Sequence, residues 1–210
     1  MALALGAMLV VPSLSLTPIA MHMAHHIAVM NVAAPLCAFA LMRPGWPMVW
    51  ASRGADLWLV TGLQMLLLWG WHAPQAHAAA TASTAVHAAM VTSLFVTSLV
   101  FWLAVLQRGV RSNWQGVFAL LITGKLACLL GALLVFSPRL LYGTAGSLHH
   151  SSLHTVGGGS LDDQHLAGLL MLTACPLSYV LSGVVIAARI VSRPITATTE
   201  SGAAAVAVCR

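Results

Sequence analysis

The stretch TAVHAAMVTSLFVTSLVFWLAVLQ, residues 84–107, decides the fold class, because it contains no charged side chain. An α-helix rises about 1.5 Å per residue, so about 20 apolar residues cross the hydrocarbon core of a bilayer. His87 stands near the beginning of the stretch, and the first charged residue after it is Arg108. The stretch therefore predicts a membrane-spanning helix with a histidine at one end and an arginine at the other.

Apolar segments of similar length recur along the chain. The 210 residues are 60% hydrophobic and only 6% charged, whereas soluble domains carry about 25% charged residues. We predict an all-α fold, a polytopic membrane helix bundle with about six transmembrane helices in the lipid bilayer. The five further segments are residues 2–19, 23–42, 56–72, 115–137 and 165–190.

The predicted domain organisation is simple. Residues 1–193 are expected to form a single transmembrane helical domain, and the Ala-rich residues 194–210 a disordered tail. The first segment is interrupted by Pro12 and Pro18, but it lacks the basic start and small-residue cleavage site of a signal peptide, so we interpret it as a retained helix. The four cysteines show no CxxC spacing, and the three within apolar runs are interpreted as small core residues.

The arginines predict the orientation of the chain in the membrane. Cytoplasmic loops carry an excess of Lys and Arg, and here six arginines fall between alternate pairs of segments or after the last one, whereas the opposite loops hold only Arg139. Both termini are therefore predicted to be cytoplasmic. Because the basic residues are scattered singly, the net charge of +5 does not indicate nucleic-acid binding. The arginines that indicate this orientation are Arg43, Arg53, Arg108, Arg111, Arg189 and Arg193.

In this topology all ten histidines fall on the outer side, and this feature points to function. They stand at the outer ends of the predicted helices or in the outer loops. A titratable residue that faces the bundle at membrane depth is a candidate functional residue. The ten are His22, His25, His26, His72, His77, His87, His149, His150, His154 and His165.

The segment HMAHH at 22–26 is the densest histidine cluster. Residues at i and i+4 share one face of a helix, so His22 and His26 can both reach one metal ion, with His25 nearly beside them. The neighbouring methionines add thioethers, and imidazole with thioether suits copper, including Cu(I). The alternative interpretation is that these imidazoles rest among the lipid headgroups and bind no metal.

Two single histidines are expected at the membrane depth of that cluster. His72 ends the third apolar segment after the aromatic run WGW, and His87 opens the fourth. A lone histidine on a helix is more often packed than ligating, so only the shared depth makes these two candidate ligands.

The segment SLDDQH at 160–165 leads into the last apolar run and has two interpretations. Ser160 and Asp163 have the spacing of a helix N-cap and its third residue, as in a capping box. Alternatively, Asp163 accepts a hydrogen bond from a metal-ligating imidazole and orients it. The remaining loop histidines lie beside Gly157–Gly159, where they are either solvated or bind metal transiently.

Several motifs of enzymes are missing from the sequence. It contains no HExxH, no GxSxG and no phosphate-binding glycine loop. We therefore predict that the protein is not an enzyme. Two alternatives from other classes stay open: a haem-binding electron-transfer membrane subunit with axial histidines such as His72 and His87, and a metal-ion channel or exporter.

The motifs resemble the CtaG family of multi-span cytochrome c oxidase assembly factors. The resemblance covers most of residues 12–190, and its most specific parts are FSPRLLY and DDQHLAGL. Two departures concern the histidines: Val91 stands where the family often has a second histidine, and His25 and His165 stand where it commonly has glutamine. The matching stretches are MHMAHHIAVMNVAAPL at 21–36, LWGWHAP at 68–74, VHAAMVTSLFVTSLVFW at 86–102, LGALLVFSPRLLY at 130–142 and LDDQHLAGLLM at 161–171.

The resemblance implies a factor for the maturation of haem–copper oxidase that handles copper on the periplasmic side of the bacterial inner membrane. It further implies partners among the oxidase subunits and other copper chaperones. The expectation is therefore a copper-binding membrane protein that delivers the ion to an oxidase subunit. Its expected ligands are His22, His26, His72 and His87, with His25 as a substitute and Asp163 and Gln164 as supporting residues.

Overall fold

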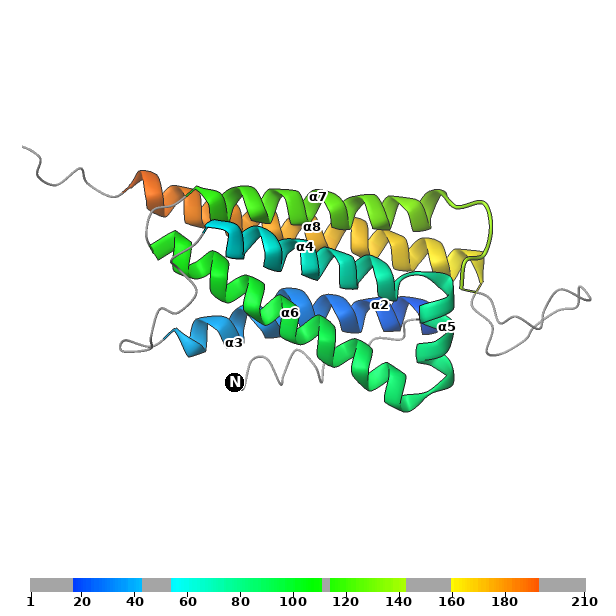
Figure 1. Ribbon diagram of the computed structural model, residues 1–210. Helices are drawn as coiled ribbons and strands as arrows, with labels where there is room; N and C mark the ends of the chain where they lie inside the picture. Colours follow the sequence, from blue (N-terminus) through cyan, green and yellow to red (C-terminus); the bar gives the residue numbers. More distant parts are fainter. Residues whose placement is uncertain (1–16, 43–53, 111–113, 143–159, 193–210) are drawn as a thin grey trace, which may run out of the picture.

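The computed structural model describes residues 17–42, 54–110, 114–142 and 160–192, and in this part of the chain every regular element is helical (Figure 1). Most of the first predicted segment, the loop histidines His149, His150 and His154, and the predicted tail lie outside the described residues. The elements are α2 (Pro18–Ala28), the π-helical turn η2 (Val29–Ala33), α3 (Ala34–Leu41), α4 (Gly54–Trp71), α5 (Pro74–Ala82), α6 (Thr84–Val110), α7 (Gln115–Phe136) and α8 (Leu161–Val191).

The prediction of about six transmembrane helices is corrected to four candidate spans among the described residues. Helix α4 was predicted as a span, but Asp56, Gln64 and its tryptophans lower the mean hydropathy of its 18 residues below that of the four candidate spans. The membrane class and the all-helical fold are confirmed. The four candidate spans are Pro18–Leu41, Thr84–Arg108, Gln115–Phe136 and Leu161–Val191.

The first span is continuous only because a π-helical turn joins α2 to α3. Pro35 stands in the first turn of α3 and has no N–H to donate, which leaves a backbone carbonyl of the preceding turn to be satisfied elsewhere. The carbonyl of Met30 accepts hydrogen bonds from Ser98 Oγ at 2.9 Å and from Trp102 Nε1 at 3.1 Å, both on α6. Neighbouring side chains thus replace the missing bond, as is required in a membrane interior.

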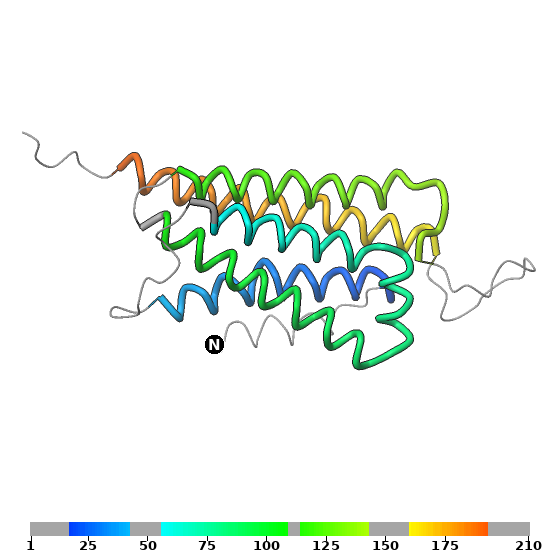
Figure 2. Tube along the Cα trace, in the orientation of Figure 1, coloured from blue at the N-terminus to red at the C-terminus, as the bar shows by residue number. Residues whose placement is uncertain are grey.

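Helices α7 and α8 pack along their length, and two glycines permit the closest approach (Figure 2). A Cβ atom added at Gly131 would lie 2.9 Å from Leu172 N, and one added at Gly168 would lie 2.9 Å from Gly131 O. Small residues at such a crossing let two membrane helices gain van der Waals contact without a side chain between them. This pair forms the wall against which α2 and α4 pack.

The helix ends that carry the described histidines gather at one end of the bundle. Helices α2, α6 and α8 begin at this end, α4 and α7 end there, and α5 closes it (Figure 1). Arg108 and Arg189 lie in the last turns of α6 and α8, at the opposite end. The prediction that residues 73–83 form a loop is wrong, because α5 occupies most of them and places His77 on a helix.

Candidate metal centre

Five histidines, from α2, α5, α6 and the turn that follows α4, form one connected cluster, and the ring centroid of His25 lies 6.5 Å from that of His26. The ring centroids of His22 and His26 are 4.4 Å apart, those of His22 and His77 4.9 Å, and those of His22 and His87 5.6 Å. His26 and His72 follow at 6.1 Å. The structure therefore brings the expected ligands of α2, His72 and His87 together, and it adds His77, which the sequence had not singled out. Pro74 at the start of an Ala-rich stretch was the available signal for the helix that carries it.

The pair His22 and His26 carries the geometry expected from the i, i+4 spacing. Their Nε2 atoms are 2.9 Å apart, close to the separation of about 3 Å between adjacent nitrogens on a metal with bonds of about 2.0–2.1 Å. The Nδ1 atom of His26 and the Nε2 atom of His25 are buried without a hydrogen-bond partner. Within the described residues, however, no three His, Cys, Asp or Glu side chains stand as a ready metal-binding group.

His72 is held in one tautomer. Its Nδ1 lies 2.6 Å from the carbonyl of Leu68, so Nδ1–H donates and Nε2 keeps its lone pair. That Nε2 faces the thioether of Met23 on α2, with 3.2 Å between Nε2 and Sδ. His72 is only 7% exposed. A neutral imidazole and a thioether thus meet in a water-poor site, and both are soft enough to bind copper.

His77 and Tyr142 complete the cluster on the side of α5. The His77 and Tyr142 ring centroids are 4.3 Å apart, and the Tyr142 hydroxyl donates to the backbone carbonyl of His72 at 3.0 Å. Burial lowers the pKa of His77 below its ordinary value of 6.5, so the neutral, metal-competent ring is favoured. Burial likewise raises the pKa of the Tyr142 hydroxyl. Tyr142 is the last residue of FSPRLLY, and the sequence alone did not indicate that it contacts the histidines.

Gln164 positions this tyrosine from α8. Its Oε1 accepts from the backbone N–H of Leu141 at 2.7 Å, and its Nε2 lies 3.3 Å from the carbonyls of Leu134 and Arg139. These three bonds fasten the segment that leaves α7 and place Tyr142 against the histidines. The side-chain hydrogen bonds of Gln164 thus run to backbone groups of the last turns of α7 and of the segment that follows it.

Asp163 holds the beginning of the histidine helix. The backbone N–H groups of Ile19 and Ala20 donate to its carboxylate at 3.0 and 2.9 Å, and the hydroxyl of Thr17 donates as well. An anion there also complements the positive end of the α2 dipole. The expected N-cap is confirmed, because Asp163 N–H donates to Ser160 Oγ at 3.0 Å. The described bonds of the carboxylate run to α2 itself, so Asp163 fixes the helix that carries His22.

The fold and the cluster define a class: a helical membrane protein whose buried histidines converge at one end of the bundle. The chain belongs to the family of cytochrome c oxidase caa3 assembly factors (Caa3_CtaG), whose pattern it matches over residues 1–193. The family role is therefore the assembly of cytochrome c oxidase, as the motif resemblance had suggested. No curated protein and no solved structure matches the chain significantly.

Proposed function

We propose that this membrane protein binds copper at the periplasmic face through its histidine cluster and delivers the ion to a subunit of cytochrome c oxidase. The observation that carries the proposal is the contact among His22, His26, His72, His77 and His87, which come from four separate helical segments. Titratable residues that face the interior of a membrane bundle are candidate functional residues, and here several of them meet in one place. The family role is the assembly of cytochrome c oxidase. A haem–copper oxidase contains copper, and imidazole and thioether ligands suit this metal.

The donor chemistry favours copper over harder metals. The neutral nitrogen of His72 stands beside the thioether of Met23, and thioether ligands select Cu(I) among the common metals. The nearby carboxylate of Asp163 is already occupied by the N–H groups of α2. A nitrogen–thioether set without carboxylate is poorly suited to Mg²⁺, Ca²⁺ or Mn²⁺.

The proposed orientation places the histidine end outside. Arg108 and Arg189 mark the opposite end of the bundle, and positive residues favour the cytoplasmic side. If the predicted segment 2–19 crosses the membrane before α2, both chain termini are then cytoplasmic, and the protein resides in the bacterial inner membrane. Copper reaches the cluster from the periplasm, with other copper chaperones as donors.

The cluster suits transfer better than permanent storage. His22 and His87 are partly exposed while His26 and His72 are buried, so an arriving ion meets open ligands first and buried ligands afterwards. A receiving subunit can displace the exposed ligands one at a time. The protein then carries out no chemical conversion of the ion and acts as a non-enzymatic metal chaperone.

Metal analysis of the detergent-purified full chain tests the proposal. After anaerobic Cu(I) loading and desalting, wild type is expected to retain about one copper more than the double variant His22→Ala/His26→Ala. His165→Ala, on α8 in the same end of the bundle, serves as a matched control and is expected to retain copper like wild type. Equal, near-zero copper in wild type and double variant would refute the proposed histidine site.

The haem-binding alternative has a separate readout. The ring contacts run from His87 through His22 and His26 to His72, so protein side chains fill the space that a haem between His72 and His87 would need. An intense Soret band in the purified protein would nevertheless overturn the copper proposal. For the exporter alternative, histidine-dependent flux of metal into sealed vesicles is the corresponding test.

A further inference from the structure

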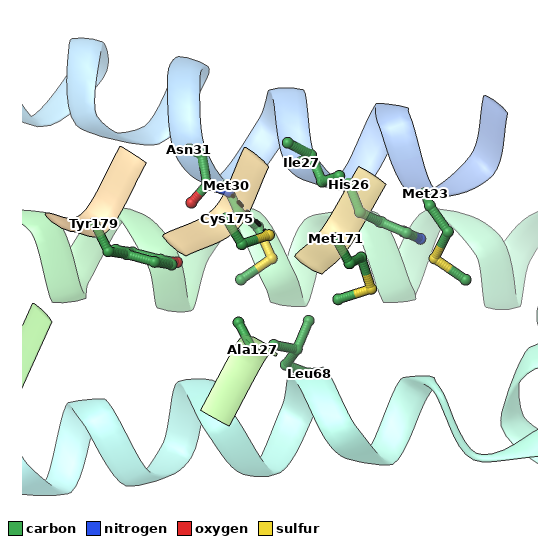
Figure 3. A pocket seen from close by; sticks show the side chains of 10 residues that line it. All are labelled: Met23, His26, Ile27, Met30, Asn31, Leu68, Ala127, Met171, Cys175 and Tyr179. Carbon is green, nitrogen blue, oxygen red and sulfur yellow. Dashed lines mark hydrogen bonds between the residues drawn. The ribbon is translucent and has the colours of Figure 1, made fainter. Parts of the chain in front are cut away.

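A small cavity lies inside the bundle, next to the histidine cluster, and its lining is rich in sulfur. The cavity has a volume of about 10 Å³, which is about the space that the centre of one water molecule or ion requires. Side chains from α2, η2 and α8 project toward α4 and α7 around it (Figure 3). The lining residues are Met23, His26, Ile27, Met30, Asn31, Leu68, Ala127, Met171, Cys175 and Tyr179.

Four of the ten lining side chains carry sulfur, and all four are buried. Met23 is 1% exposed, Met30 4%, Met171 3% and Cys175 6%. Met23 belongs to α2, Met30 to η2, and Met171 and Cys175 to α8, so three helical elements contribute sulfur atoms to one cavity. A methionine usually serves as an adaptable core side chain, and a second observation is therefore needed to indicate a ligand.

That observation is an unpaired polar atom on the same lining. His26 is 5% exposed, and its Nδ1 has no hydrogen-bond partner among the described residues. Asn31 donates from Nδ2 to Cys175 Sγ at 3.4 Å, while its Oδ1 is also buried and unpaired. Buried polar atoms normally have partners, and an orphaned one calls for an explanation such as an ion. The residue that carries this unpaired nitrogen lines the same cavity as the four sulfur-bearing side chains.

The chemistry of this lining selects a soft monovalent cation. Thioether and thiolate ligands favour Cu(I), and the described lining includes no carboxylate that would favour a hard ion. The charge also balances: Cys175–SH and Cu⁺ give Cys175–S–Cu and H⁺, the proton leaving to solvent. The bound complex is then neutral in an apolar interior, where an isolated cation would be strongly disfavoured. The Asn31 amide donates to the sulfur that bears the charge.

We propose that this cavity is a second, interior Cu(I) site beneath the histidine cluster. The choice of ion rests on the proposed copper function, whereas the site itself rests on the cavity. The two sites share a border, because His26 belongs to both and His72 Nε2 lies 3.2 Å from Met23 Sδ. An ion can therefore pass between nitrogen and sulfur ligands within the protein. The proposed ligands are the sulfur atoms of Met23, Met30, Met171 and Cys175, and the Nδ1 atom of His26 joins them only while its Nε2 carries the proton and does not bind the outer ion.

Copper-edge X-ray absorption on the full chain in detergent, loaded anaerobically with Cu(I), tests this site. Wild type is expected to show both nitrogen and sulfur scattering, and Met171→Leu/Cys175→Ala is expected to lose about one copper per chain and most of the sulfur component, leaving only the Met23 thioether beside His72. Met90→Leu/Cys37→Ala is the matched control, because neither residue lines the cavity. Selenomethionine labelling of wild type adds a mutation-free measurement, in which a copper–selenium contact is expected.

The outcomes separate this inference from the proposed function. Sulfur scattering that persists in His22→Ala/His87→Ala supports the interior site, since neither histidine lines the cavity. Copper bound in wild type by nitrogen with no more than one sulfur, the thioether of Met23, and retained unchanged in Met171→Leu/Cys175→Ala, overturns the interior site and leaves the histidine site standing. Sulfur-bound copper without any histidine-dependent copper overturns the outer site and leaves the interior one.

Discussion

The replacement Asp163→Asn tests whether one carboxylate holds the histidine helix in place. Asp163 is 3% exposed and accepts from Thr17, Ile19 and Ala20. Asparagine keeps the shape but loses the charge, and its amide nitrogen, which replaces one of the two accepting oxygens, cannot accept from an N–H. Hydrogen bonds to a charged group contribute about 1.5–3 kcal/mol each, and an unpaired buried N–H costs about 1–3 kcal/mol. We therefore expect the free energy of unfolding to fall by about 2–4 kcal/mol, most of which is specific to the α2 contact.

The assay is reversible unfolding in mixed micelles, followed by tryptophan fluorescence, with copper retention measured in parallel. Asp162→Asn is the control, because Asp162 occupies the same first turn of α8 but is exposed. A change within about 0.5 kcal/mol is expected for this exposed residue. If Asp163→Asn were as stable as Asp162→Asn and retained as much copper as wild type, the argument that α8 positions the histidine helix would be wrong.

Three further predictions follow from separate contacts. Gly168→Ala places a Cβ 2.9 Å from a backbone oxygen of α7 and is expected to destabilise the fold by about 1–3 kcal/mol in the same unfolding assay, whereas Gly62→Ala, with open space around it, should not destabilise it. Gln164→Leu removes the side-chain hydrogen bonds of Gln164 to the backbone of Leu134, Arg139 and Leu141. Amide hydrogen exchange in the residues before Tyr142 should then quicken at least tenfold. Unchanged protection there would contradict the argument that Gln164 positions Tyr142. Burial lowers the pKa of His77 below 6.5 in the folded protein. As the pH falls, the unfolded chain therefore takes up a proton on His77 before the folded protein does, and stability is lost below about pH 6.5. Between pH 8 and pH 5 the melting temperature of His77→Gln should fall less than that of wild type.

The sequence predicts well what depends on local pattern. Uninterrupted apolar runs predicted α6 and α7 to within a few residues, because a membrane allows no other backbone geometry. The i, i+4 spacing predicted that His22 and His26 meet, which the 2.9 Å contact between their Nε2 atoms confirms. Ser160 was likewise identified as an N-cap from spacing alone.

What the sequence did not predict depends on contacts between distant segments. Asp163 bonds to Thr17, almost the whole length of the described chain away, and no local pattern distinguishes that partner from an imidazole. His77 was expected in a loop, because α5 is short and its weak amphipathicity hides it. The sulfur-lined cavity escaped notice because Cys175 and Met171 resemble ordinary core residues until α8 packs against α2.

The π-helical turn at Val29–Ala33 has a consequence for the register of the first span. One extra residue within a turn rotates everything beyond it by about 100° relative to a regular helix. Because of this offset, α2 packs against α8 while α3 packs against α6. In a regular helix of the same sequence, the same side chains could not contact both partners. Removing one residue from the turn would preserve length and hydropathy almost unchanged. It would nevertheless turn His22 and His26 away from His72, so the position of the cluster is encoded in the middle of the membrane as well as at its edge.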